Sequence, residues 1–462
     1  MPNIIESLFV LTLVSVLMLV LNYCAKIISI AAAYKAKLLC SGVFISHRNP
    51  EAVVHEDLEA EDLAYFRLVT PQVDFIKQSA SASLFGLSKR TAIYKPDLGC
   101  FLVYGDKPIN DASLQPIPHE SGFNTSQLNS HDSHHTMDVT TQNHLDSVLD
   151  WAFAEPDSKH KRRTRAVVIL LDGKIVAERY APGFDQNMPL PGWSMAKSVI
   201  NALVGVLVGQ GKLDLDAPAP VPIWQGIDDP RREITLNYLM LMTSGLEFIE
   251  KSNNPLYDLT KMLLTTPNAY AYAASKTLRA KPGSHWHYAS GNTNIISRII
   301  RDTLGEEGYR RFPLEALFEP VGMENAKFEA DASGTFVGSS FLYATARDWA
   351  KFGQLYLQDG VWEGNRILPE GWVSYSTTPT LESNGRYGAH FWLECEPKKV
   401  RDGTERPLPP GAFHAMGYEG QCVSMLPSHQ LVVVRLGLTR KTDVWRQDKF
   451  LNRILDAIAV SE

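Results

Sequence analysis

One stretch constrains this chain more than any other. Residues 191–211 read PGWSMAKSVINALVGVLVGQG and contain a single charged side chain, Lys197. The stretch is apolar on nearly all faces at helical spacing, and such a helix is stable only where the rest of the chain covers it. A chain of 462 residues is long enough to build the core that this requires. We therefore predict a central, buried helix.

The lone lysine of this helix needs a physical reason. Ser194 lies three residues before Lys197, so the two side chains share a helix face and can meet near its amino end. Burial favours the neutral amine that a general base requires, and free backbone N–H groups of the first turn can stabilise an oxyanion. The residues alone leave two interpretations: a nucleophile with its base, or a lysine whose charged end reaches solvent.

Two hairpin patterns at opposite ends of one region predict an antiparallel sheet. Residues 166–171 and 174–180 flank Asp172-Gly173, a dipeptide typical of tight hairpins. Residues 421–426 and 430–436 form a similar pair. We expect amphipathic helices at residues 143–153 and 445–459, and mostly helical structure at residues 195–209, 236–242, 292–303 and 344–357. Strands from both ends would then share one sheet, with a helical insertion between them.

Four segments, in this order, resemble the serine β-lactamase and penicillin-binding-protein superfamily, in its class C and esterase-type branch. The first is Ser194-x-x-Lys197. The others are ITLNYLMLMTSGLEF (234–248), KPGSHWHYASGNTN (281–294) and ATARDWAKFGQLYLQDGVWEGNRILPEGWV (344–373). They are similar to the branch's helix with its turn, its Tyr-x-Ser motif and its late helical segment. The resemblance covers residues from about 160 to 460 and does not include the first 150.

The resemblance implies a β-lactamase-like α/β (α+β) fold, with an antiparallel sheet flanked by helices and an all-helical lobe. It also implies roles for particular residues. Ser194 would be the acylated nucleophile and Lys197 its base. Tyr288 would be the second general base and acid, with Ser290 as its hydrogen-bonding companion. A phenol near a lysine suits this chemistry, because a leaving group must be protonated and a water later deprotonated. A buried core tyrosine is the alternative for Tyr288.

The third motif of the superfamily is where this sequence departs from the pattern. In FHAMGYEGQCVSMLP (413–427), Gly417 aligns with the glycine of the β-lactamase Lys-Thr-Gly, but Ala415 and Met416 stand where Lys-Thr would be. His414 is one place off. Gly417 would let the strand approach the substrate, and the N–H of Tyr418 would be the second oxyanion donor. The cation for an antibiotic carboxylate is missing, which disfavours a true β-lactamase.

The Gly-x-x-Gly-Gln ending of this motif instead resembles 6-aminohexanoate-dimer hydrolases and carboxylesterases. We therefore expect a serine hydrolase that cleaves a carboxylic ester or a small linear amide through a Ser194 acyl-enzyme. By the same resemblance Tyr257 is a candidate substrate contact, although a loop aromatic packed on its neighbours is the other interpretation. D-amino-acid peptidase activity, β-lactamase activity and a non-catalytic, membrane-tethered penicillin-binding-type receptor remain as alternatives.

Other chemistries find no support in the sequence. There is no Gly-x-Ser-x-Gly elbow, His-Glu-x-x-His motif, Walker loop or dinucleotide fingerprint, so no cofactor and no metal are predicted. A net charge of −6 without a long basic run argues against nucleic acid as a partner. A polar stretch at residues 108–142 is interpreted as a loop rather than a metal site, although it contains His131, Asp132, His134 and His135.

The amino terminus predicts contact with a membrane. Residues 7–25 carry no charge and are long enough to cross a hydrocarbon core as a helix. No basic residue precedes this run, and Lys26, Lys35 and Lys37 follow it, which favours an uncleaved anchor over a signal peptide. Those cations would keep the carboxyl side cytoplasmic, whereas residues 31–33, three alanines, offer a late cleavage site. Topology therefore stays open between a membrane-anchored and a periplasmic or secreted protein; a buried core helix is the alternative.

The sequence divides into three parts on this basis. Residues 1–38 form the membrane anchor or signal, residues 39–142 an extension with a polar linker, and residues 143–462 the hydrolase domain. Five cysteines without metal-binding spacing are expected to be free thiols, mostly buried; a disulfide between Cys40 and Cys100 is the alternative in an oxidising compartment. The sequence carries no prediction of oligomeric state.

Overall fold

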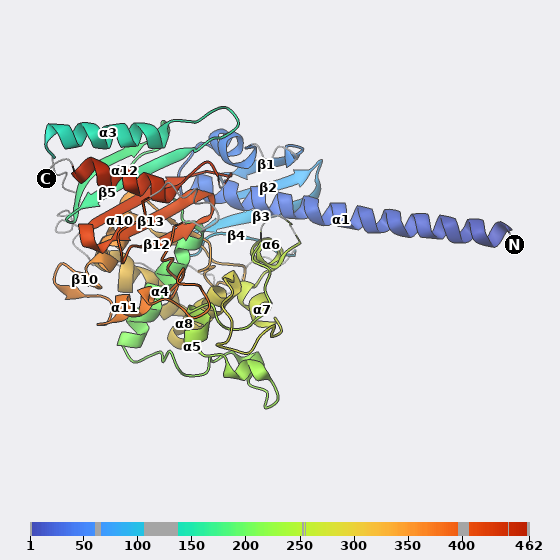
Figure 1. Cartoon of the computed structure of the whole chain (residues 1–462). Coiled ribbons are helices and arrows are strands. Elements are labelled where there is room, and N and C mark those ends of the chain that lie inside the picture. Colours follow the sequence, from blue (N-terminus) through green and yellow to red (C-terminus); the bar gives the residue numbers. More distant parts are fainter. Residues whose placement is uncertain are drawn as a thin grey trace. The chain divides into compact units, whose positions relative to one another are not determined.

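The chain forms two compact units, which are shown in Figure 1. The first unit comprises Met1–Ile109 and Ile249–Pro267, and the second comprises Asn110–Phe248 and Asn268–Glu462. The structure is a computed structural model that describes residues 2–60, 66–105, 137–251, 254, 256–395, 406–441 and 443–459.

The first unit is built on one long helix, α1 (Pro2–Phe44). Its carboxyl-terminal half packs on an antiparallel sheet of order β1-β2-β3-β4. These strands are β1 (Val69–Asp74), β2 (Ser79–Leu84), β3 (Leu87–Lys95) and β4 (Gly99–Leu102). The unit also contains α2 (Pro50–Val53), a π-helical turn (Val54–Leu58) and α6 (Asp258–Leu264).

The sequence did not predict this sheet. Strand β2 reads SASASL, so its alternation is between small residues and carries no apolar signal. Ala80 and Ala82 are each 1% exposed, and α1 packs closely along β2 and β3. Small side chains let the helix and the strands approach each other, which explains both the packing and the lack of a pattern in the sequence.

The second unit contains a five-stranded antiparallel sheet of order β12-β13-β14-β5-β6. Its strands are β5 (Thr164–Leu171), β6 (Lys174–Tyr180), β12 (Phe413–Gly417), β13 (Gln421–Leu426) and β14 (Leu431–Gly437). Strand β14 pairs with β5, so both ends of the region share one sheet, as predicted. The turn at Asp172-Gly173 has φ values of 49° and 74°, which fits the tight hairpin that this dipeptide favours.

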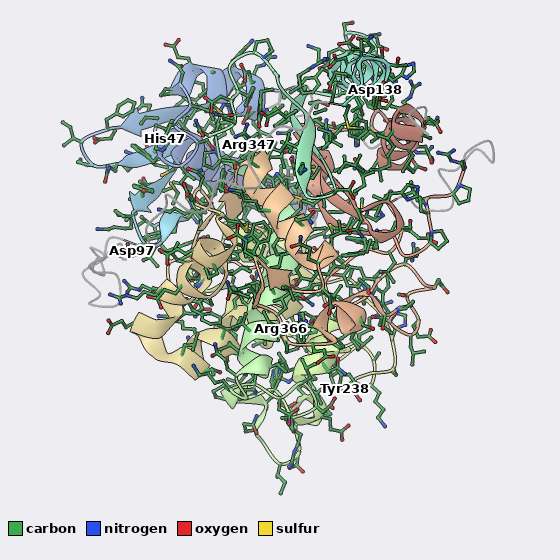
Figure 2. The ribbon with its side chains drawn as sticks, turned by 90° about the vertical axis from the view of Figure 1, so that its left-hand side faces the viewer. His47, Asp97, Asp138, Tyr238, Arg347 and Arg366 are labelled. Carbon is green, nitrogen blue, oxygen red and sulfur yellow. The ribbon has the colours of Figure 1, made fainter. Side chains whose placement is uncertain are left out.

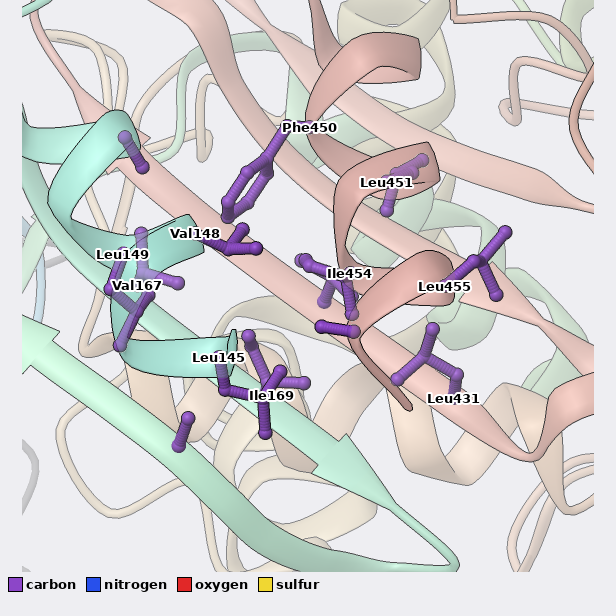
Figure 3. Close-up of a cluster of buried hydrophobic side chains, with 14 of the residues drawn as sticks. Leu145, Val148, Leu149, Val167, Ile169, Leu431, Phe450, Leu451, Ile454 and Leu455 are labelled. Carbon is purple, nitrogen blue, oxygen red and sulfur yellow. The ribbon is translucent and has the colours of Figure 1, made fainter. Parts of the chain in front are cut away.

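Helices cover both faces of this sheet. Helices α3 (Val139–Phe153) and α12 (Gln447–Ala459) form one apolar layer with the side chains of β5 and β14 (Figure 3). Asp138 caps α3 by accepting hydrogen bonds from two backbone N–H groups. On the other face, α10 (Ala346–Leu357) packs on β13, β14 and β5. Arg347 of α10 binds Glu178 of β6 at 2.6 Å, and both Asp138 and Arg347 are labelled in Figure 2.

The remaining elements of the second unit are mainly helical, as the sequence predicts. The buried helix expected at residues 195–209 is α4 (Ala196–Gly209), whose residues 196–207 are all buried. The others are α5 (Leu236–Met240), α7 (Ala269–Ala274), α8 (Ser290–Pro313), α9 (Glu319–Val321) and α11 (Trp372–Thr377). Two small sheets complete it. One has the order β7-β9-β8, with β7 (Leu190–Pro191), β8 (Lys327–Phe328) and β9 (Leu342–Ala344), and the other pairs β10 (Val361–Trp362) with β11 (Asn365–Arg366).

Two further expectations, on the apolar amino-terminal run and on the cysteines, can be compared with the structure. Within the described ranges, the helix Glu6–Phe44 has the length and hydropathy of a membrane span, and its most apolar window is entirely exposed. All five cysteines are free, and all except Cys24 are buried. The free-thiol expectation is thereby confirmed.

Candidate active site

The predicted nucleophile lies in a tight turn just before the central helix. Strand β7 ends at Pro191, a 3-10 turn spans Trp193–Met195, and α4 begins at Ala196. Ser194 is half-buried in this turn. Trp193 has a φ of 49°, a left-handed conformation that is costly for a bulky side chain. The turn therefore holds the serine hydroxyl at the start of α4 by a strained backbone rather than by regular helix.

Lys197 lies inside the protein and does not reach solvent. The residue is 1% exposed. Its Nζ lies 3.1 Å from Ser194 Oγ, 3.0 Å from Ser290 Oγ and 2.8 Å from the carbonyl oxygen of Ser339. The structure thus brings together Ser194, Lys197 and Ser290, although Lys197 and Ser290 are 93 residues apart in sequence. A lysine directed to solvent is excluded.

The Tyr-x-Ser motif reaches the lysine from the start of α8. Ser290 is the first residue of this helix and is fully buried. The ring centroid of Tyr288, two residues earlier, lies 5.0 Å from Lys197 Nζ. The Tyr288 ring also packs against Trp392, with centroids 5.3 Å apart, and against Tyr387, at 5.6 Å. Tyr288 is half-buried beside the lysine, so it belongs to the site and not to a closed core.

A second motif holds the segment that carries Tyr288. The turn after α5 accepts backbone hydrogen bonds at Met242 O from His287 N and at Thr243 O from Gly283 N, both 2.8 Å long. Ser244 Oγ donates to Asn292 Oδ1 at 2.8 Å. Gly245 has a φ of 77°, and a Cβ there would lie 2.3 Å from Ala280 O. The helix-plus-turn segment at residues 234–248 therefore fixes the approach of the Tyr288 motif to α4.

The end of β12 borders the site on the side of the nucleophile turn. A Cβ on Gly417 would lie 2.2 Å from the carbonyl oxygen of Gly192, so only glycine lets this strand touch the nucleophile turn. Tyr418 follows, is 44% exposed, and packs its ring edge-on to Trp193 with centroids 5.7 Å apart. The backbone of residues 417–418 is thus next to residues 192–193, as a two-donor oxyanion site requires.

Sequence reasoning missed a buried ionic cluster behind this edge. Glu419 has a φ of 64°, and its side chain is 2% exposed. Its Oε2 accepts a hydrogen bond from the Trp193 indole at 3.0 Å, and its Oε1 lies 3.3 Å from an Arg440 nitrogen. The carboxylate therefore joins the nucleophile turn to the turn that follows β12.

Arg435 supports the same turn from within the sheet. It is 0% exposed and donates to the carbonyl oxygens of Glu419 and Gly420 at 3.1 and 3.0 Å. Burial lowers the pKa of its guanidinium to about 9, and the group stacks 4.4 Å from the Trp445 ring centroid. A signal was present in the sequence, because this is the one charge in the apolar strand LVVVRLG.

Two histidines near the site are buried and neutral. Burial lowers the pKa of His414 to about 3, and its ring contacts Cys395 Sγ at 3.0 Å and Ser424 Oγ at 2.9 Å. It supplies no cation in place of the missing lysine of the third motif. Burial lowers the pKa of His390 to about 3. Its Nδ1–H donates to the Lys197 carbonyl oxygen at 3.0 Å.

The remaining candidate residues lie elsewhere. Tyr257 belongs to the first unit, where it directly precedes α6, so its contact with substrate stays a prediction. The described residues contain no group of three or more His, Cys, Asp and Glu side chains that could hold a metal ion. His131, Asp132, His134 and His135 lie outside the described residues. The end of the stretch predicted as a loop, residues 139–142, is instead the first turn of α3.

Comparisons with known proteins identify the family. The model of a family described as Beta-lactamase matches residues 149–455. The 6-aminohexanoate-dimer hydrolase of Paenarthrobacter ureafaciens is 25% identical over 297 residues, which are 59% of this chain and 72% of that relative.

Solved structures show the same fold. A Bacillus anthracis protein provisionally named a 6-aminohexanoate-dimer hydrolase has a TM-score of 0.56 and 24% identity, covering 69% of this chain and 81% of its own. A family VIII carboxylesterase has a TM-score of 0.53 and 16% identity, covering 70% and 98%. The predicted β-lactamase-like α/β fold, with its antiparallel sheet, flanking helices and helical lobe, is confirmed.

Proposed function

Because the chain belongs to the β-lactamase family, we propose that it is a serine hydrolase that cleaves a carboxylic ester or a small linear amide through an acyl-enzyme on Ser194. The observation that carries this proposal is the position of Lys197. Its Nζ is buried and lies 3.1 Å from Ser194 Oγ, which is within reach for proton transfer.

The partners of Lys197 suit a neutral amine. The carbonyl oxygen of Ser339 can only accept, so one N–H of the amine points to it across 2.8 Å. The second N–H is directed to Ser290 Oγ at 3.0 Å. In the proposed mechanism the lone pair faces Ser194 Oγ, whose proton it takes as the oxygen attacks the substrate carbonyl. A buried site favours this form, since desolvation penalises the ammonium ion.

Tyr288 is placed to complete the proton transfers. Its ring centroid lies 5.0 Å from Lys197 Nζ, and we assign the phenol the role of second general acid and base beside this amine. In acylation Tyr288 protonates the leaving alkoxide or amine, and in deacylation it takes a proton from the attacking water. The negative charge on the carbonyl oxygen would be stabilised by the backbone N–H groups of Ser194 and Tyr418.

The third motif favours an ester or linear amide over a β-lactam. Ala415 and Met416 replace the lysine and threonine that bind an antibiotic carboxylate, and His414 is buried and neutral. The names of the relatives point the same way, since one is a hydrolase of a 6-aminohexanoate dimer and another a carboxylesterase. Tyr257 remains the proposed substrate-contacting aromatic.

The test is labelling and turnover of a Ser194→Ala variant. We expect wild type to react with a fluorophosphonate probe and to hydrolyse short-chain nitrophenyl esters, and the variant to do neither. Ser284→Ala, an exposed serine in the Tyr288 segment, is the matched control and should behave as wild type. Linear amides, D-amino-acid peptides and a chromogenic cephalosporin, assayed in parallel, identify the substrate class.

Two outcomes would reject the proposal. Labelling of Ser194→Ala would show that another residue is the nucleophile. A stoichiometric burst of nitrophenol from wild type without steady turnover would show a binding protein rather than a hydrolase.

We further propose that α1 anchors the protein in a membrane without being cleaved. Ala32 and Ala33, within the suggested cleavage site, are 0% exposed in the core of the first unit. Cleavage there would remove the start of a helix segment on which the sheet packs. Full-length and truncated forms differ in mass, so mass spectrometry of the membrane fraction tests this directly; loss of residues 1–33 from the mature protein would refute it.

A further inference from the structure

The first unit carries an apolar cluster at one end of its sheet. Leu68 is 64% exposed, Phe85 81% and Leu87 69%. Strand pairing joins Val69 to Leu84 and Leu84 to Leu87, so the three side chains lie at the same end. We call these residues the tip cluster. Isolated exposed apolar residues need no explanation, but three together at one end indicate a binding surface.

The turn within this cluster is costly for the residue that occupies it. Phe85 and Gly86 have φ values of 50° and 82°, the pattern of a type I′ turn that favours Asn, Asp or Gly at both positions. A phenylalanine there is strained and also exposes its ring to water. A polar residue would suit both the backbone and the solvent better, so the ring needs an apolar partner outside the unit.

The direction of α1 shows where that partner lies. Lys35 Nζ donates to Val69 O at 3.0 Å, near the tip cluster, while the ring of Phe44 lies 6.0 Å from that of Phe75 at the opposite end of β1. Helix α1 therefore runs parallel to β1, and its earlier residues extend beyond the tip-cluster end. Figure 1 shows this part of α1 continuing past the sheet as one unbroken helix.

The change in burial along α1 shows at which residue of the helix the sheet ends. Residues 6–26 are exposed, residues 27–29 are partly buried and burial becomes extensive from Ile30 onward. The sheet therefore ends where the uncharged run 7–25 stops. At about 1.5 Å per residue that run is close to the roughly 30 Å thickness of a hydrocarbon core, with Lys26 at its boundary.

We propose that the first unit rests on the bilayer that α1 crosses, with Leu68, Phe85 and Leu87 inserted at the level of the lipid headgroups. Besides Lys26, the exposed cations Arg67 and Lys89 flank the tip cluster in sequence. Cations beside apolar side chains suit a surface with acyl chains below and phosphate groups above. The continuous helix from the span into the sheet leaves no linker, so the unit is held against the membrane. This inference rests on the proposed anchor and does not depend on the hydrolase activity.

The test measures the depth of spin labels in the full-length chain, reconstituted in phosphatidylcholine vesicles containing phosphatidylserine. Single labels replace Leu87 at the tip cluster, Ile76 at the opposite turn and Ser15 within α1, in a Cys24→Ser background because Cys24 is exposed. Ile76 is 97% exposed, so it is the matched control in the same sheet. We expect the ratio of oxygen to nickel-chelate accessibility to be several times higher at 87 than at 76, and highest at 15.

A second variant tests the role of the phenylalanine. Phe85→Asp should lower the accessibility ratio measured at position 87 to the low value measured at position 76. Lys77→Asp, at the opposite turn, should leave the ratio at position 87 unchanged. A low ratio at 87 with a high ratio at 15 would overturn the proposal, since the unit would stand away from the membrane. A low ratio at 15 would overturn it together with the anchor. Dipolar broadening at 87 without lipid exposure would overturn it by assigning the tip cluster to a second copy of the chain.

Discussion

Replacing Gly417 by alanine tests the geometry of the site at one atom. The added Cβ would lie 2.2 Å from Gly192 O, a backbone atom that cannot rotate away. Protein Cβ atoms essentially never approach closer than 3.0 Å, so the end of β12 and the nucleophile turn must separate by at least 0.8 Å. The two proposed oxyanion donors, the N–H groups of Ser194 and Tyr418, lie on the two sides of this contact.

The expected effect follows from that separation. A misplacement of about 1 Å in a catalytic arrangement costs about 10²-fold in rate, which is about 2.7 kcal/mol of transition-state stabilisation. This agrees with the roughly 10² to 10³-fold loss on removal of one oxyanion donor. Overpacking also costs about 1–3 kcal/mol of folding stability, so Gly417→Ala should fold but with a lower unfolding midpoint.

The assay is the acylation rate with an activated ester, normalised to the folded fraction from chemical unfolding. Gly226→Ala is the control, because a Cβ there would meet only Asp229 Cβ at 3.7 Å, an ordinary contact. We expect kcat/KM to fall by about 10²-fold for Gly417→Ala and to stay near wild type for Gly226→Ala. A folded Gly417→Ala protein with wild-type acylation would refute the assignment of this edge as the oxyanion site.

Three further predictions concern Lys197, Ser290 and His414. Lys197→Met should abolish acylation, and it should lower the unfolding midpoint only moderately, because it keeps the volume but leaves Ser339 O without its donor; a variant that still acylates would exclude the lysine as base. Ser290→Ala should lower kcat/KM by about ten- to a hundredfold, since it leaves a buried N–H of Lys197 without its acceptor at 3.0 Å; an unchanged pH profile and rate would contradict this. The pKa of His414 falls to about 3 on folding, so below its unfolded value of about 6.5 the unfolded chain takes up a proton that the folded chain does not. Its contribution to stability is therefore present above pH 6.5 and lost as the pH falls, and the stability difference between wild type and His414→Gln should shrink by about 2 kcal/mol from pH 6.5 to 4.5 in urea titrations; a difference independent of pH would refute a neutral buried histidine.

Local patterns were sufficient to predict much of the second unit. The dipeptide Asp172-Gly173 specifies a turn geometry by itself, and the structure has that turn. The burial of α4 could be predicted from its sequence, because a helix that is apolar on all sides is stable only inside the protein. The spacing of three made Ser194 and Lys197 candidates, but only the resemblance to a known family favoured a nucleophile with its base over a lysine that reaches solvent. Ser290, 93 residues from Lys197, also needed that resemblance.

The first unit could not be predicted for a different reason. Strand β2 alternates serine and alanine, and the helix α1 that packs on it carries the small side chains Ala32, Ala33 and Ala36, which are all 0% exposed. Close packing of small residues leaves no hydrophobic periodicity to detect. The surface of α1 also differs along its length: the first half is exposed and apolar, and the second half is buried against the sheet. Only the first half gives a strong hydropathy signal in the sequence.

The contact between two strained turns could not be predicted from the sequence either. It helps to fix the geometry of the proposed oxyanion site. Trp193 and Glu419 both adopt left-handed backbone conformations, with φ values of 49° and 64°, and their side chains bind each other at 3.0 Å. Each conformation costs free energy by itself, so it persists only if the surroundings over-determine it. The carboxylate joins the two turns, Arg440 compensates its charge at 3.3 Å, and Arg435 binds the backbone of the second turn. Since one turn carries Ser194 and the other follows Tyr418, this buried cluster fixes the distance between the two proposed oxyanion donors before any substrate arrives, which is the preorganisation that electrostatic catalysis requires.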